Sequence, residues 1–244
     1  MILIDADILT YRVGFSCEGE SVSVAVSTMD SYLADLLVSP FLTEFADDYQ
    51  LYLTGKGNYR NEVAVTAAYK ENRSGKAKPV HLDALREHLV ENWEATVTDG
   101  EEADDAIAIA ATELGEAAVM VSIDKDFDQI PGWHYNFVKH KLYKVSPQEA
   151  TAAFYQQVLK GDRIDNIIGL KGIGDVKAAK MLKDCTSETE YYDTCVAAYV
   201  KHEELSTEEA EARVLENARL LWLRRKQEEL WEPPVRNEAE ENHQ

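Results

Sequence analysis

The sequence predicts an α/β fold: a mostly parallel sheet flanked by helices, followed by a helical region. Apolar runs of strand length alternate with amphipathic stretches up to about residue 145, which is the pattern of a largely parallel sheet. The run "AAVMVSID" (117–124) is apolar almost throughout, as expected of a strand that helices cover on both faces. From residue 146 on, the apolar spacing is helical.

The predicted elements follow in order along the chain. Apolar runs of strand length stand at residues 1–7, 49–55, 94–98, 117–124, 133–138 and 141–145. The last two runs indicate a hairpin or two edge strands. Stretches with helical spacing stand at residues 21–38, 81–93, 103–114 and 146–161. The last stretch opens with Ser-Pro and ends with Gly, a common entry and exit of a helix.

Composition and charge exclude some classes of protein. No apolar run approaches the roughly 18 residues of a membrane span, and the start lacks the basic flank of a signal peptide. The three cysteines are scattered without a C-x-x-C pair, which favours free thiols in a reducing cytosol. The net charge of −20 argues at first against nucleic acid. Basic residues nevertheless cluster between Lys56 and Arg86, so the net charge of the whole chain says little about whether it binds nucleic acid.

Carboxylates recur at the ends of predicted strands and the starts of helices. In a parallel sheet the carboxyl ends of the strands share one edge, so we expect several of these groups to lie together there. They are Asp5 after the first strand, Glu102, Asp104 and Asp105 at a helix start, Asp124 and Asp126 after strand 117–124, and Asp162 and Asp165 in "GDRIDN".

Each of these acidic groups has a structural alternative. Carboxylates at a helix start cap its amides, and Asp124 and Asp126 alone could be turn residues. Asp99 and Glu101 are interpreted as cap and surface charges. Together, however, crowded carboxylates repel one another and raise each other's pKa, and a divalent cation offsets that repulsion. Oxygen ligands without His or Cys favour Mg²⁺ or Mn²⁺, and two such ions suit phosphodiester hydrolysis.

The stretch "GDRIDNIIGLKGIGDVKAAKML" (161–182) contains glycines that indicate a tight turn between two helical segments. Glycine permits unusual backbone angles and close approach of other groups. The exposed amides of the helix that begins after Gly174, together with nearby lysines, suit a phosphate backbone. A plain structural helical hairpin is the alternative. The predicted DNA contacts in this stretch are Lys171, Gly172, Gly174 and Lys177.

"LIDAD", "EADD", "SIDKDFDQI" and "GDRIDNIIGLKGIG" occur in an order and spacing that resembles the flap endonuclease/5′-nuclease superfamily. The chain looks most like the compact bacteriophage 5′–3′ exonucleases, over about residues 1–182. The resemblance implies a PIN-like nuclease core followed by a helix–three-turn–helix DNA-binding motif. We place the core at residues 1–158, with a small arch region near 60–82, and the motif with the C-terminal helices at 159–244.

The resemblance also implies site residues. Asp5, Glu102, Asp104 and Asp105 would serve a first metal, and Asp124, Asp126, Asp162 and Asp165 a second. A K⁺ ion would sit at the glycine hairpin, between Gly169 and Gly174. In "YKENR", Lys70 and Arg73 would reach the scissile phosphate, a role that phosphoryl chemistry also requires, and Tyr69 could stack on a terminal base. Without the motif, Lys70 and Arg73 read as solvated surface charges. Arg60 is a weaker candidate for a phosphate contact.

Two departures from the family pattern stand out. Many relatives carry a further Asp after the second strand, where this chain has Gly55, so one metal ligand is missing or replaced by water. The segment between "YKENR" and "EADD" is short, so any arch is small, with "RSGKAKP" (73–79) as a flexible basic loop.

The C-terminal stretch predicts a helix that begins at a cap, Ser206 or Thr207, and packs on the core. Arg224, Arg225 and Lys226 follow it and could touch duplex DNA, although nearby glutamates dilute their field.

The sequence therefore predicts a cytoplasmic, monomeric, metal-dependent 5′-nuclease, within a bacterial host if it is phage-encoded. Its expected partners are DNA with a 5′ end, flap or nick, and RNA–DNA hybrids. We expect 5′–3′ exonuclease activity with flap endonuclease or RNase H-like activity. The first alternative is a structure-specific DNA-binding protein with a degraded metal site. The second is a phosphatase for small esters, against which the glycine hairpin argues, because a small substrate needs no duplex clamp.

Overall fold

In the computed structural model, which describes residues 1–45 and 48–236, the chain divides into two compact units. The first unit consists of Met1–Tyr59, Gly75–Pro147 and Leu223–Glu229. The second consists of Arg60–Ser74, Gln148–Trp222 and the residues from Leu230 on. Each unit is thus assembled from segments that are far apart in the sequence, and each is described by itself below.

The first unit is built on a six-stranded sheet with the strand order β3-β2-β1-β4-β5-β6. All neighbouring strands are parallel except β5 and β6, which form an antiparallel pair. This confirms the predicted mostly parallel sheet, with a hairpin at its edge. The strands are β1 (Ile2–Asp5), β2 (Tyr49–Thr54), β3 (Thr96–Thr98), β4 (Val119–Val121), β5 (Gly132–Asn136) and β6 (Lys141–Val145).

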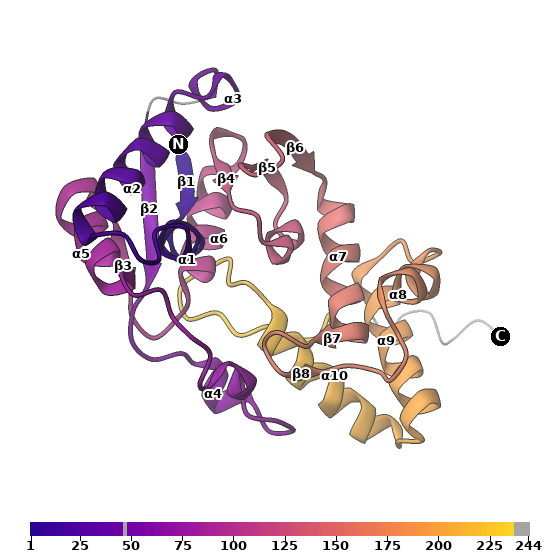
Figure 1. Ribbon diagram of the computed structural model, residues 1–244. Helices are drawn as coiled ribbons and strands as arrows, with labels where there is room; N and C mark the ends of the chain where they lie inside the picture. The colour runs from indigo at the N-terminus through magenta and orange to yellow at the C-terminus, as the bar shows by residue number, and fades with distance from the viewer. Residues whose placement is uncertain (46–47, 237–244) are drawn as a thin grey trace. The chain divides into compact units, whose positions relative to one another are not determined.

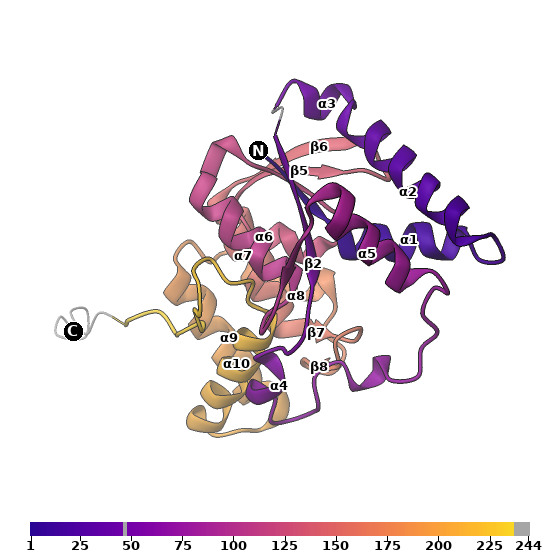
Figure 2. The same cartoon turned by 90° about the vertical axis from the view of Figure 1, so that its left-hand side faces the viewer.

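Helices cover both faces of this sheet (Figures 1 and 2). Helices α1 (Ala6–Ser16), α2 (Val22–Leu37) and α5 (Leu82–Trp93) pack on one face, where Ile2 and Ile4 of β1 point. Helix α6 (Ala103–Leu114) packs on the other face, against Leu3 of β1 and Met120 of β4. Both faces of β1 and β4 are therefore buried, which explains why these strands are apolar throughout.

Helix α1 is absent from the sequence-based expectations. Its apolar residues Leu9 and Val13 face the core, but the chain passes from β1 into the helix at Asp5 without any intervening loop. Asp5 itself is the N-cap, and its side chain accepts a hydrogen bond from the amide of Ile8. No turn residues therefore signal the start of this helix. The remaining short elements of the unit are α3 (Pro40–Thr43) and the 3₁₀ turns Gly115–Ala117 and Lys125–Gln129.

The second unit is mainly helical, around a core that includes Phe154, Tyr199, Val214 and Trp231. The predicted cap of the last helix is confirmed at Ser206, whose hydroxyl accepts from the amide of Glu209. The helices are α4 (Arg60–Val63), the 3₁₀ turn Glu71–Arg73, α7 (Pro147–Lys160), α8 (Asp175–Leu182), α9 (Glu188–Glu203) and α10 (Thr207–Leu221).

A two-stranded ribbon interrupts these helices, which corrects the expectation of helix alone after residue 146. Strands β7 (Gly161–Asp162) and β8 (Ile167–Ile168) pair in antiparallel fashion and carry "GDRIDN" in the connecting turn. A Cβ at Gly169 would lie 2.1 Å from the carbonyl carbon of Lys160, so the ribbon requires glycine at this close approach. In residues 1–45 and 48–236 no helix has the length and hydropathy to cross a membrane.

Candidate active site

The carboxyl ends of β1, β2, β3 and β4 share one edge of the first unit's sheet, because these strands are parallel neighbours. Asp5 ends β1, and Asp124 follows β4 after two residues. The Ser122 hydroxyl donates to Asp5 Oδ2 and accepts from the Asp124 amide, so the two residues lie near each other. The structure thus brings these two strand-end residues together, as expected for a parallel sheet.

Asp5 is the buried carboxylate of this edge, with 2% of its surface exposed. Its Oδ2 accepts a hydrogen bond of 2.7 Å from the Ser122 hydroxyl, and its Oδ1 accepts one of 3.2 Å from the Ile8 amide. The pKa of Asp5 is raised from 3.8 to about 7, mainly by burial and in smaller part by the carboxylates of Asp7 and Asp124, whereas the hydrogen bonds from Ser122 and Ile8 lower it. A cation beside Asp5 would favour its charged form.

Asp124 and Asp126 lie in the turn that follows β4. The Ser122 hydroxyl accepts from the amide of Asp124 at 3.0 Å, and Asp124 Oδ1 accepts from the amide of Asp126 at 2.9 Å. Asp124 thereby caps the 3₁₀ turn Lys125–Gln129. Asp124 is thus a turn residue, which was the structural alternative considered from the sequence. The turn holds both carboxylates close to the sheet edge, where Asp124 is exposed and Asp126 is half-buried.

The start of α6 is fixed to the same edge, since the Ala103 amide donates to the Thr54 hydroxyl at the end of β2, at 2.9 Å. Glu102 and Asp104 are half-buried there, whereas Asp105 is fully buried. Asp105 Oδ2 accepts from the Glu102 amide at 3.2 Å, and Oδ1 accepts from the Arg224 amide at 3.1 Å. Backbone donors therefore engage both oxygens of Asp105, the capping role that was its structural alternative.

Glu101 is not the surface charge expected from the sequence. It is 7% exposed, and its carboxylate pairs with the guanidinium of Arg224 at 3.0 Å. Arg224 is itself 8% exposed and stacks on Tyr59 with 3.7 Å between its guanidinium carbon and the ring centroid. The expectation that Arg224 could touch duplex DNA is therefore wrong, because its guanidinium is buried against protein groups.

In the second unit, the residues of "YKENR" converge on Asp165. The Lys70 ammonium lies 3.5 Å from Asp165 Oδ2, and the Arg73 guanidinium pairs with Asp165 Oδ1. The Tyr69 hydroxyl donates to Asp165 Oδ2 at 2.9 Å. The structure thus brings both predicted catalytic cations to one of the predicted metal ligands. Lys70 adopts a left-handed backbone with φ of +56°, which turns the chain at this point.

Two predicted DNA contacts are corrected by burial. Tyr69 is 9% exposed and packs in the core of the second unit, so its ring is covered and cannot stack on a base. Arg60 is 1% exposed, and its guanidinium donates to the carbonyls of Leu220 and Trp222 at 2.8 and 2.7 Å. Arg60 therefore satisfies the last carbonyls of α10 rather than a phosphate.

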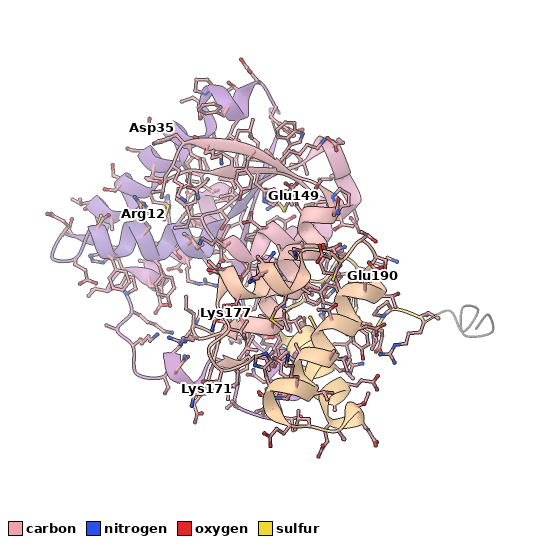
Figure 3. The ribbon with its side chains drawn as sticks, turned by 90° about the vertical axis from the view of Figure 1, so that its right-hand side faces the viewer. Arg12, Asp35, Glu149, Lys171, Lys177 and Glu190 are labelled. Carbon is pink, nitrogen blue, oxygen red and sulfur yellow. The ribbon has the colours of Figure 1, made fainter. Side chains whose placement is uncertain are left out.

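The predicted glycine hairpin lies between β8 and α8 in the second unit. Gly172 has φ of +75°, Gly174 caps α8, and both are exposed. The side chains of Lys171 and Lys177 are also exposed, from the turn and from the first turn of α8 (Figure 3). The Lys177 ammonium donates to the Gly172 carbonyl at 2.8 Å.

Asp162 stands at the start of the β7–β8 turn. Its Oδ1 accepts from the amides of Ile164 and Asp165 at 2.6 and 3.4 Å, which fixes the turn that presents Asp165. The predicted members of the second metal site are thus split: Asp162 and Asp165 belong to the second unit, while Asp124 and Asp126 belong to the first.

The donor set of the first unit's sheet edge fits a hard divalent cation, although the ligands do not form a closed cluster. Among the described residues, no three His, Cys, Asp or Glu side chains are grouped as a ready metal site. The candidate metal ligands at the edge are all carboxylates, and the buried Asp5 has a pKa raised by burial and by like charges. Oxygen donors of this kind suit Mg²⁺ or Mn²⁺.

Gly55 follows β2 at the same edge, in the place where the family pattern has a carboxylate. A Cβ at this position would lie 2.3 Å from Asp99 Oδ1 and 2.5 Å from the Thr98 carbonyl oxygen. Asp99 Oδ1 also accepts from the Lys56 amide at 2.7 Å. The carboxylate of the neighbouring strand end therefore occupies the space that a side chain at Gly55 would need.

Sequence reasoning missed two residues that organise this edge. Ser122 bridges Asp5 and Asp124 through its hydroxyl, and its place in "SID" directly after an apolar strand is a signal that could have found it. Arg224 holds Asp105 and Glu101 from 119 and 123 positions away, a separation across which local spacing carries no signal.

No family model matches the chain. Curated relatives include DNA polymerase I of Bacillus caldotenax, 24% identical over 207 residues, which cover 75% of this chain and 23% of that protein. They also include flap endonuclease Xni of Shewanella sp. (strain W3-18-1), 33% identical over 129 residues, which cover 47% of this chain and 49% of that protein. The chain thus spans about a quarter to a half of the length of these relatives.

Several solved nuclease structures also resemble this chain. The bacteriophage T5 5′-exonuclease, in a mutant form, superposes with a TM-score of 0.62 at 17% identity, over 90% of this chain and 86% of that chain. The chain resembles the flap endonuclease/5′-nuclease superfamily. The T5 protein co-crystallised with metal ions gives a TM-score of 0.63 at 19% identity, covering 90% and 88% of the two chains. The catalytic core of Rad2 in complex with DNA substrate gives 0.52 at 12%, covering 88% and 70%. At these identities the likeness establishes the fold.

Proposed function

We propose that the protein is a divalent-metal-dependent 5′-nuclease that hydrolyses phosphodiester bonds at DNA 5′ ends or junctions. The observation that carries this proposal is the set of carboxylates at one sheet edge, where the hydroxyl of Ser122 bridges the buried Asp5 to Asp124. A divalent cation beside Asp5 would favour its ionised form. The relatives named as flap endonuclease and 5′-exonuclease, and the fold shared with the T5 protein, support the same activity.

The carboxylates of the first unit would hold a Mg²⁺ or Mn²⁺ ion. Asp5, Asp104, Asp124 and Asp126 would supply oxygens, and Glu102 would reach the ion from the start of α6. Asp105, whose oxygens accept from backbone amides, would act by fixing that helix start. Asp162 and Asp165 of the second unit would bind a second ion. When bound, the ions would activate water and stabilise the leaving 3′-oxygen.

Lys70 and Arg73 would bind the scissile phosphate and stabilise the charge that develops on it. Both cations now contact Asp165, so their ammonium and guanidinium groups are held together by one carboxylate. If Asp165 served as a metal ligand, Lys70 and Arg73 would lose this partner and would be available to bind the phosphate. The side chains of this protein would thereby couple metal binding at Asp165 to recognition of the substrate.

The glycine hairpin would contact the phosphate backbone of duplex DNA through the amides near Gly172 and Gly174 and the side chains of Lys171 and Lys177. Such contacts recognise shape and charge rather than sequence. The Gly172 carbonyl accepts a hydrogen bond from Lys177. If K⁺ binds at the hairpin, this carbonyl would coordinate the ion instead. RNA–DNA hybrids are the second class of substrate we propose. The protein would act as a monomer in the cytoplasm, that of a bacterial host if it is phage-encoded.

A structure-specific DNA-binding protein with a degraded metal site is the second candidate. It is favoured by Gly55, where Asp99 and Thr98 leave no room for a side chain, and by the open arrangement of the carboxylates among the described residues. This candidate predicts DNA binding without cleavage in either Mg²⁺ or Mn²⁺. The nuclease proposal predicts cleavage that EDTA abolishes.

One experiment separates the two. The 5′-labelled flap, nicked, blunt and RNA–DNA substrates are incubated with the protein in Mg²⁺, in Mn²⁺ and in EDTA, and the products are resolved on a gel. The double variant Asp124→Asn, Asp126→Asn should lose metal-dependent cleavage while its circular dichroism spectrum is unchanged. The matched control is Asp35→Asn, exposed on α2 (Figure 3), which should cleave like wild type. Retained cleavage by the double variant would refute the assignment of the site.

A further inference from the structure

Residues Leu223–Glu229 form a segment that we call the C-terminal strap. The strap belongs to the first unit, whereas α10 with Trp222 before it and the residues from Leu230 on belong to the second. Leu223 and Arg224 are 4% and 8% exposed, so the strap begins as a buried part of the α/β unit. It contacts two elements that carry candidate metal ligands, the start of α6 and the 3₁₀ turn Lys125–Gln129.

At the start of α6 the strap contacts both sides of the acidic run through Arg224. Its amide donates to Asp105 Oδ1 at 3.1 Å, and its guanidinium pairs with Glu101 at 3.0 Å. Both side chains of this ion pair are only 10% exposed. The guanidinium also donates through Nε to the Glu229 carbonyl at 3.0 Å and stacks on Tyr59. The arginine is therefore fixed on several sides before any ligand arrives.

At the turn after β4 the strap holds Gln129, which is 1% exposed. The Leu223 amide donates to Gln129 Oε1 at 2.9 Å, and the Arg225 guanidinium donates to the Gln129 carbonyl at 2.9 Å. Gln129 ends the 3₁₀ turn that begins after Asp124 and contains Asp126. One short segment thus joins the two carboxylate-bearing elements of the sheet edge.

We propose that Arg224 is a positioning residue of the metal site, acting through Glu101 and Asp105 on Glu102 and Asp104. The inference rests on the proposed nuclease function. Several carboxylates crowd the start of α6, and their mutual repulsion pushes this helix start away from a geometry in which they share one ion. Arg224 opposes this repulsion with a buried positive charge and with an amide aimed at Asp105. Groups that orient metal ligands without touching the ion commonly control metal affinity by about 10- to 100-fold.

The test is calorimetric titration of the DNA-free 244-residue chain with Mn²⁺ alone, together with the Mg²⁺ concentration that gives half-maximal cleavage. Arg224→Ala should weaken Mn²⁺ binding by about 10-fold or more and raise the Mg²⁺ requirement in parallel. Arg224→Lys keeps a cation beside Glu101 but loses the planar fork, so its Mn²⁺ affinity should be intermediate. The matched control is Lys226→Ala, which removes one exposed positive charge from the same strap and should bind like wild type.

Thermal melting in EDTA separates metal affinity from folding. A folded Arg224→Ala protein with wild-type Mn²⁺ affinity would overturn the proposal, and so would Arg224→Lys with wild-type affinity if the alanine variant does not fold. Weaker Mn²⁺ binding by Lys226→Ala to the same extent would also overturn it, because net charge would then explain the effect. If the wild-type protein neither binds Mn²⁺ nor cleaves DNA, the nuclease proposal itself fails, which is a different result from an unaffected variant.

Discussion

The carboxylates of the two units have opposite electrostatic surroundings. In the first unit, Asp5 is buried with neutral hydrogen-bond donors, and the neighbouring charges that act on its pKa are the carboxylates of Asp7 and Asp124. In the second unit, Asp165 is held by two cations and a phenol, from Lys70, Arg73 and Tyr69. The first environment disfavours the ionised carboxylate, whereas the second places opposite charges around the carboxylate.

This difference indicates which unit gains most from a metal ion. A buried carboxylate beside like charges is an electrostatic cost of the fold that a divalent cation can remove. A carboxylate already paired with lysine and arginine gains less, because the incoming ion must displace its present partners. We therefore expect the first metal to bind to the α/β unit, and metal binding at Asp165 to require rearrangement of Lys70 and Arg73.

The largest expected effect is that of Asp5→Asn on the stability of the metal-free protein. The pKa of Asp5 in the folded state, about 7, lies above its ordinary value of 3.8. Its contribution to stability is therefore full below pH 4 and is lost as pH rises through about 7. At pH 8 the variant should be more stable than wild type by up to about 4 kcal/mol, and it should lose metal-dependent cleavage.

Chemical denaturation of both proteins in EDTA at pH 4, 6 and 8 measures this difference in unfolding free energy. The gain should be small at pH 4 and grow toward pH 8, and saturating Mg²⁺ should stabilise wild type but not the variant. A difference that does not change with pH would contradict an uncompensated carboxylate at Asp5. Asp35→Asn, with its exposed side chain on α2, serves as the control.

The next effect is that of adding a carboxylate to the same edge with Gly55→Asp. Its Cβ would meet Asp99 Oδ1 and the Thr98 carbonyl oxygen, so strands β2 and β3 must shift. We expect a loss of about 2 kcal/mol of unfolding free energy, measured by denaturation in EDTA. Gly55→Ala separates the steric part from the charge. If Gly55→Asp were as stable as wild type and bound Mn²⁺ more tightly, the edge would have room for the ligand that the family pattern carries.

The smallest effect should have the opposite sign to that of Asp5→Asn. Asp165→Asn removes the carboxylate between Lys70 and Arg73 and should destabilise the protein by about 1 kcal/mol, because the partly exposed cations are screened by water. The Lys70 and Arg73 side chains are 23% and 44% exposed. Denaturation at pH 7 measures the loss, and Lys70→Met in the same chain should recover part of it. A stabilising Asp165→Asn would remove the contrast between the two units.

Local pattern predicted much of this fold, because strand and helix periodicity depends on neighbours within a few residues. The parallel sheet and the shared edge of Asp5 and Asp124 followed from it. Helix α1 was not predicted because it follows β1 without a loop. Arg60 bonds to Trp222, Tyr69 to Asp165 and Arg224 to Asp105, which lie 162, 96 and 119 positions away in the chain. A charged or aromatic residue in a basic stretch suggests a ligand, and only tertiary structure reveals that it is buried.

The interleaving of the two units has a consequence for synthesis on the ribosome. The guanidinium of Arg60 donates to carbonyls of Leu220 and Trp222, and the strap that completes the first unit begins at Leu223. At a translation rate of about 5–20 residues per second, Arg60 is made on the order of ten seconds or more before the residues that accept its hydrogen bonds. Neither unit can be completed in the nascent chain before residue 223 is made. We therefore expect the proposed activity to appear only after the strap from Leu223 to Glu229 has been made.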